Sequence, residues 1–119
     1  MNVLPRADKA IIPIEKFTEY SLNPEKSKDK ATAFEKALGY NLSNYQVLVS
    51  EIRSNLTNFP AEPKPDFGHG TRYEVVMKLV GPNGKTANVL TAWIDDNKNG
   101  EMRLINAYID KEKGVQSND

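Results

Sequence analysis

The sequence predicts an α+β fold in which about three N-terminal helices pack on a C-terminal three-stranded antiparallel meander. Apolar residues recur at helical spacing over the first half of the chain and alternate with polar residues over the second half. Three prolines and two glycines in PAEPKPDFGHG, residues 60–70, separate the two halves. Helices and strands segregated in this way are typical of an α+β domain with helices on one face of its sheet.

Three helices are predicted from the apolar spacing and from residues that begin or end helices. The first, over 14–21, follows Pro13 and stops before Pro24, because a residue that precedes proline disfavours the helical region. The second, over 27–38, ends at Gly39, where a left-handed residue closes a helix. The third, over 44–57, begins after Ser43 as its cap and carries one apolar stripe. The helical part therefore spans about 14–58.

Residues 60–70 are predicted to form a loop, because a stretch so rich in proline and glycine holds neither a helix nor a strand ladder. The meander then spans about 71–110, with TRYEVVMKLV as its first strand and a hairpin turn at GPNG. If Gly81 pairs with Lys85 across that turn, Tyr73 faces Trp93 on the second strand. DDNKNG forms the next turn, EMRLINAYID the third strand, and 111–119 a flexible polar tail.

Length and composition predict a single domain over 1–119, with a core of two packed layers. The 39% of hydrophobic and 27% of charged residues are typical of globular proteins. The 16 basic and 16 acidic side chains leave a net charge of zero, so nucleic-acid binding needs a local basic patch.

Several kinds of site and location are excluded or disfavoured by the sequence. The chain has no cysteine, which excludes disulfides, thiolate metal sites and cysteine nucleophiles. No apolar stretch approaches the roughly 18 to 20 residues that cross a bilayer, and MNVLPRADKA lacks the apolar core of a signal peptide. We therefore expect a cytoplasmic protein without a membrane partner; a domain cut from a longer exported chain would look the same.

Four motifs could form a catalytic, metal-binding or phosphate-binding site. The single histidine, His69, excludes a two-histidine ribonuclease; it is either a lone general acid or base, or an exposed loop residue between glycines.

DDNKNG matches half of a calcium loop but lacks the glutamate at position twelve, where Asn106 stands, so we expect no metal and no cofactor. GPNGK is a hairpin turn rather than a phosphate loop. The lysines of KSKDK form a basic edge that either meets phosphate or is a solvated face.

Polar and aromatic residues stand among aliphatic ones in the last two strands. A sheet covered by helices on one side leaves the other side open to solvent, and rings, hydroxyls and a guanidinium there would suit RNA. The alternative is that Trp93 and Tyr108 belong to the core, while Thr91 and Arg103 fill mixed cross-strand positions. The register of the third strand decides between the two, and the sequence leaves it open.

The chain resembles a family of small bacterial domains of unknown function. The motifs that carry the resemblance are LPxAxKAxI, LNP, KAxxF, GPNGK, TAW and RLxxAY, which cover residues 4 to 109. Domains of this kind are phage- and toxin-associated, and their layout is similar to the barnase, EndoU, colicin and RelE group of metal-independent ribonuclease toxins. Asn106 departs from the family pattern, which has threonine there.

The resemblance implies a toxin-like domain that cleaves RNA without a metal and works with a cognate immunity or antitoxin protein. In this hypothesis Lys30 and Arg103 stabilise phosphate charge, and Tyr108 or His69 transfers protons. The residues expected to hold the substrate are Arg72, Thr91, Trp93 and Asn106. Zero net charge favours the alternative, a non-catalytic protein-binding or accessory module.

Overall fold

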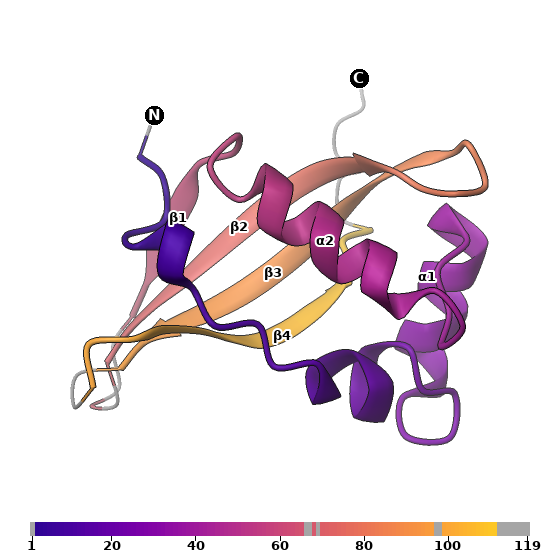
Figure 1. Cartoon of the computed structure of the whole chain (residues 1–119), viewed down its shortest axis with the longest axis horizontal. Helices are drawn as coiled ribbons and strands as arrows, with labels where there is room; N and C mark the ends of the chain where they lie inside the picture. Colours follow the sequence, from indigo (N-terminus) through magenta and orange to yellow (C-terminus); the bar gives the residue numbers. More distant parts are fainter. Residues whose placement is uncertain (1, 66–67, 69, 97–98, 112–119) are drawn as a thin grey trace.

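The computed structural model places four antiparallel strands behind a layer of helices (Figure 1). It describes residues 2–65, 68, 70–96 and 99–111. The helical elements are the 3-10 turn η1 (Ala7–Lys9), the π-helix η2 (Phe17–Ser21), α1 (Lys28–Leu38) and α2 (Tyr45–Asn55). The strands are β1 (Ala61–Lys64), β2 (Thr71–Val80), β3 (Thr86–Asp95) and β4 (Met102–Ile109), paired in the order β1-β2-β3-β4.

The α+β class is confirmed, but the prediction of a three-stranded meander is wrong. Part of the proline-rich segment forms the strand β1, in which Pro63 pairs in register with Tyr73 of β2. β1 is an edge strand, and proline is tolerated at an edge because its missing N–H is not needed by a further strand. The sequence rule failed because it treated proline as a breaker wherever it occurs.

All three helical segments are close to their predicted ranges. Gly39 ends α1 with a φ of 89°, the left-handed conformation expected of a closing glycine. The segment predicted as a helix over 14–21 is helical over 15–21, and Phe17–Ser21 within it form the π-helix η2. Within the described residues of the last segment, Lys111 is exposed; the rest of the predicted tail, 112–119, lies outside them.

The predicted hairpin register between β2 and β3 is confirmed. The Gly81 N–H donates to the Lys85 carbonyl at 2.9 Å, and Tyr73 pairs with Trp93. β4 then pairs with β3 through a register shift at Ala92/Trp93, which leaves Ile105 opposite no residue. This β-bulge decides which side chains of β4 share a face, and nothing in the sequence pattern marks it.

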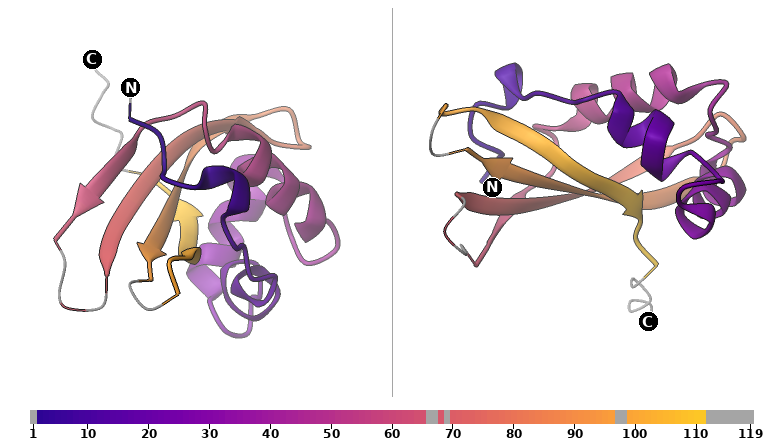
Figure 2. Two further views of the ribbon diagram at one scale, coloured as in Figure 1. Left: turned by 60° about the vertical axis from the view of Figure 1, so that its left-hand side comes forward. Right: turned by 90° about the horizontal axis from the view of Figure 1, so that it is seen from below.

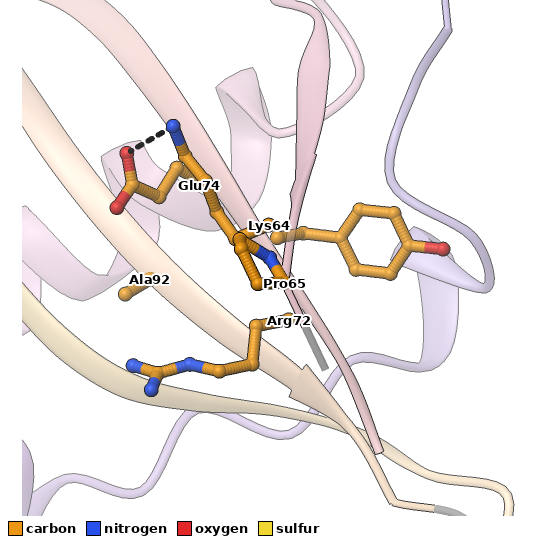
Figure 3. A pocket seen from close by; sticks show the side chains of 6 residues that line it. Lys64, Pro65, Arg72, Glu74 and Ala92 are labelled. Atoms are coloured by element: carbon orange, nitrogen blue, oxygen red, sulfur yellow. Dashed lines mark ion pairs between the residues drawn. The ribbon is translucent and has the colours of Figure 1, made fainter. Parts of the chain in front are cut away.

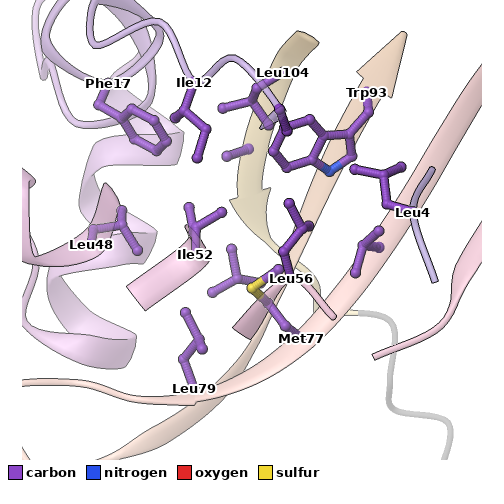
Figure 4. Packing of buried hydrophobic residues seen from close by; sticks show 14 of the residues in the cluster. Leu4, Ile12, Phe17, Leu48, Ile52, Leu56, Met77, Leu79, Trp93 and Leu104 are labelled. Carbon is purple, nitrogen blue, oxygen red and sulfur yellow. The ribbon is translucent and has the colours of Figure 1, made fainter. Parts of the chain in front are cut away.

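The core lies between one face of the sheet and the helical layer (Figures 2 and 4). Met77, Trp93 and Leu104 of the sheet pack there against residues such as Phe17 and Ile52, all fully buried. Burial of such large apolar side chains stabilises the fold by about 1.5–3 kcal/mol each. The covered face is therefore the structural face of the sheet.

The N-terminal segment, which carries the LPxAxKAxI motif, closes the edge of β4. Its apolar side chains Leu4, Ala7, Ala10 and Ile12 are buried. Ile11 lies beside Arg103, and its N–H and carbonyl bond the backbone of β4 at 2.8 and 2.9 Å. Most of this motif therefore serves the fold, because it fills the core and satisfies an edge that would otherwise invite pairing.

The GPNG turn has a structural partner in α1. The Asn83 N–H donates to the Leu38 carbonyl at 3.2 Å, so the turn satisfies an oxygen at the helix end that lacks a partner within the helix. Gly81 lies so close that a Cβ there would overlap the Leu38 carbonyl oxygen. The prediction of a hairpin turn at GPNG holds, and the turn also fixes α1 against the sheet.

Candidate nucleic-acid interface

The sheet face away from the helical layer carries a row of basic residues across its strands. Strand register aligns Lys64 with Arg72, Arg72 with Ile94, and Ile94 with Arg103. Neighbouring strands lie about 4.8 Å apart, so Arg72 and Arg103 start about 10 Å apart. We call Lys64, Arg72 and Arg103 the basic row.

Carboxylates compensate part of the basic row. The Lys64 ammonium lies 3.1 Å from Glu62 and 3.6 Å from Glu74. The hydrogen bond to Glu62, together with the charge of Glu74, raises the pKa of Lys64 above its ordinary value. Arg103 lies 3.6 Å from Glu101, and both side chains are more than two-fifths exposed. Exposed pairs of this kind contribute little to stability and exchange readily for another anion.

Arg72 lines a shallow pocket on this face together with Lys64, Pro65, Glu74 and Ala92 (Figure 3). The pocket has a volume of about 280 Å³. No ion pair of Arg72 occurs within the described part of the chain.

A second cluster lies where α1 meets β4. The Lys30 ammonium donates to the Asn106 side-chain oxygen at 2.9 Å and lies 5.9 Å from the centre of the Tyr108 ring. The same oxygen of Asn106 accepts the Ala107 N–H at 2.9 Å. Asn106 therefore ties Lys30 to the backbone of β4 and holds the ammonium beside Tyr108. We call Lys30, Asn106 and Tyr108 the lysine–tyrosine cluster.

The predicted site residues fall into these two groups rather than one hollow. Arg103 lies opposite Ile94, and Tyr108 lies opposite Leu90, four residues away along β3. Four residues of strand span about 13 Å. Asn106, which holds the Lys30 ammonium, lies opposite Ala92, two residues or about 7 Å from Ile94, so Arg103 and Lys30 can contact the same phosphate or successive phosphates of a strand.

Thr91 and Trp93 lie on the other, helix-covered face, and neither is exposed to solvent. The Trp93 Nε1–H donates to the Thr91 hydroxyl at 2.8 Å, and that hydroxyl donates to the Val75 carbonyl at 2.8 Å. Both side chains thus have their polar atoms satisfied inside the core. We leave them out of the proposed site, since a substrate on the open face does not reach them.

The remaining predicted residues and motifs are placed as follows. His69 and Asn97 lie outside the described residues. Asp95, the first residue of the calcium-like pattern, forms an ion pair with Arg6. No group of three or more acidic, histidine or cysteine side chains that could hold a metal occurs among the described residues.

Sequence reasoning missed two features of this surface. Lys64 lies in a segment that was predicted to be a loop, although the alternation of apolar and polar residues in AEPK indicates a short strand. Lys28, Lys36 and Lys111 line a groove between α1 and the end of β4. Their i, i+8 spacing placed the first two on one face of the predicted helix, but only the fold brings Lys111 beside them.

A family described as a domain of unknown function (DUF6883) matches residues 3–111. The chain belongs to this family. No curated protein matches it. The DUF6883 chain also has the fold of a chain in the contact-dependent growth inhibition toxin–immunity protein complex from Klebsiella pneumoniae 342. The two are 14% identical, and the TM-score is 0.63 over 85% of this chain and 100% of that one. At this identity the likeness establishes a shared fold.

No helix in the described ranges of this DUF6883 chain is long and apolar enough to cross a membrane.

Proposed function

We propose that this chain is a toxin-type domain that binds RNA across the open face of its sheet and cleaves it at the lysine–tyrosine cluster. The observation that carries the proposal is the placement of Lys30 beside Tyr108, with the basic row further along the same face. A row of cations with a nearby aromatic ring suits a strand of phosphates and bases. The fold shared with a chain of a toxin–immunity complex supports the toxin assignment.

The reaction proposed is transfer of the phosphoryl group within the RNA chain, without a metal. The 2′-hydroxyl of one nucleotide gives its proton to water and attacks the adjacent phosphorus, and the bond to the 5′-oxygen of the next nucleotide breaks. A 2′,3′-cyclic phosphate and a 5′-hydroxyl result. Lys30 stabilises the charge that develops on the phosphate oxygens, and Tyr108 or His69 transfers the proton that the 5′-oxygen gains.

Arg72 and Arg103 have a separate role in this proposal. They bind phosphates of the strand beside the cleaved one and hold the strand in register. Asn106 positions the Lys30 ammonium through the hydrogen bond of 2.9 Å, rather than contacting the substrate itself. A neutralising immunity or antitoxin protein that covers this face is the partner that the proposal implies.

A purified-protein assay tests the proposal. Labelled single-stranded RNA is incubated with the chain, and the new ends are analysed for a 2′,3′-cyclic phosphate and a 5′-hydroxyl. We expect Lys30→Met to lower the cleavage rate by about 10²–10³-fold, and Tyr108→Phe by about 10²-fold or more. Lys9→Met removes an exposed lysine that belongs to neither group and serves as the matched control.

The alternative is a non-catalytic module that binds another protein. The net charge of zero and the two glutamates beside Lys64 favour it. If the wild-type chain leaves RNA intact and the Lys30→Met chain behaves identically, the cleavage proposal is wrong and this alternative takes its place.

A further inference from the structure

A groove of about 620 Å³ lies between α1 and the end of β4, outside the site proposed above. Lys28, Asp29 and Lys36 of α1 line it, together with Lys111 after β4. Its floor includes Ala33 and Ile109, which are small or largely buried. The groove is therefore lined both by charged side chains and by apolar ones.

The charges around the groove differ from those of the whole chain. Of the residues that the structure describes, three lysines and one aspartate line it, whereas the chain has 16 basic and 16 acidic residues. Among the described residues, no ion pair involves Lys28, Lys36 or Lys111. Lys28 and Lys36 are eight residues apart, which is about 12 Å along a helix. A ligand that contacts both must therefore carry several negative charges along its length.

The groove and the lysine–tyrosine cluster flank the edge where α1 meets β4. Lys30, which donates to Asn106, lies in the same first turn of α1 as Lys28, about 200° around the helix from it. Tyr108 immediately precedes Ile109, a residue of the groove, and consecutive residues of a strand point to opposite faces. A strand that passes Lys30 and Tyr108 therefore reaches the groove by passing around this edge.

We propose that this groove binds the phosphate backbone of the RNA beyond the point of cleavage, so that the substrate is a polynucleotide rather than a mono- or dinucleotide. This inference rests on the proposed function. Lysine ammonium groups meet phosphates as point charges without reading the bases. An acidic protein suits the groove less well, because none of the described residues that line it is a tryptophan, tyrosine or arginine that could anchor a protein interface.

Binding measured against salt concentration tests the groove. The probe is a single-stranded RNA of about 12 nucleotides, long enough for one extended binding site, with 2′-O-methyl groups so that it cannot be cleaved. Each lysine lost from a phosphate contact lowers the slope of log affinity against log salt by about 0.7. Lys28→Gln/Lys36→Gln should therefore lower that slope by about 1.4 and weaken binding at low salt.

The matched control is Lys9→Gln/Lys16→Gln, which removes the same charge from residues that do not line the groove. We expect its slope to equal that of the wild type. Circular dichroism of each variant confirms that the fold is retained.

Three outcomes would overturn the inference, and they differ in what they say of the proposed function. If the wild type binds the probe and the groove variant keeps its slope, the groove is not a phosphate site, and the proposed function stands. If the wild type binds no RNA, both proposals fail. If the groove variant loses affinity for an acidic protein partner while its RNA slope is unchanged, the groove is a protein-docking site.

Discussion

Replacement of Thr91 by valine tests the hydrogen bonds that link Trp93, Thr91 and the Val75 carbonyl inside the core. Valine has nearly the shape of threonine but no hydroxyl, so the Trp93 Nε1–H loses its acceptor at 2.8 Å. Trp93 is fully buried, and water cannot replace the lost partner without opening the core. An unsatisfied buried donor costs about 1–3 kcal/mol, and we expect a loss near 2 kcal/mol.

The assay is urea unfolding followed by the fluorescence of Trp93, the single tryptophan of the chain. In a thermal melt, for which the unfolding entropy is about 2.1 cal/mol/K per residue, the same loss near 2 kcal/mol lowers Tm by about 8 °C. Thr86→Val, at an exposed position of the same strand, should change the free energy of unfolding by less than about 0.5 kcal/mol. Equal stabilities of Thr91→Val and the wild type would refute the role given to this hydroxyl.

Three further changes test other parts of the structure. Gly81→Ala should destabilise the fold by about 1–3 kcal/mol, because the new methyl group overlaps the end of α1; a thermal melt identical to the wild type would contradict the close approach. Burial, with a smaller effect of the Glu51 charge, raises the pKa of Tyr40 above 10.0. The unfolded chain therefore loses this proton first, so stability falls as pH rises above 10 and Tyr40→Phe should flatten that fall; Tyr20→Phe, at an exposed position, should not. Arg103→Ala should weaken RNA binding and growth inhibition in cells while leaving the free energy of unfolding within about 0.5 kcal/mol of the wild type; undiminished toxicity would remove Arg103 from the site.

Much of the helical part could be predicted from local patterns. The apolar spacing of α1 and α2 and the closing Gly39 are properties of neighbouring residues. The β2–β3 hairpin is equally local, because the GPNG turn sets its register. These elements could be predicted because the residues that determine them lie within a few positions of one another.

The features that the sequence analysis predicted wrongly or missed are set by interactions between distant parts of the chain. β1 forms because β2 offers it an edge, although its own sequence contains Pro63. The bulge in β4 and the Ile11 bridge are likewise set by packing, and they decide where Arg103, Asn106 and Tyr108 lie. The sequence therefore suggested the residues of the lysine–tyrosine cluster without their grouping. It offered a core position for Trp93 only as an alternative that also placed Tyr108 in the core.

Mapping new RNA ends in cells after induced expression of the chain tests the proposed RNA cleavage most directly. If the lysine–tyrosine cluster cleaves RNA, the wild type produces discrete new 5′-hydroxyl ends, Lys30→Met abolishes them, and Lys9→Met leaves them unchanged. The same RNA ends in induced and uninduced cells, or equal ends from Lys30→Met and the wild type, would contradict it.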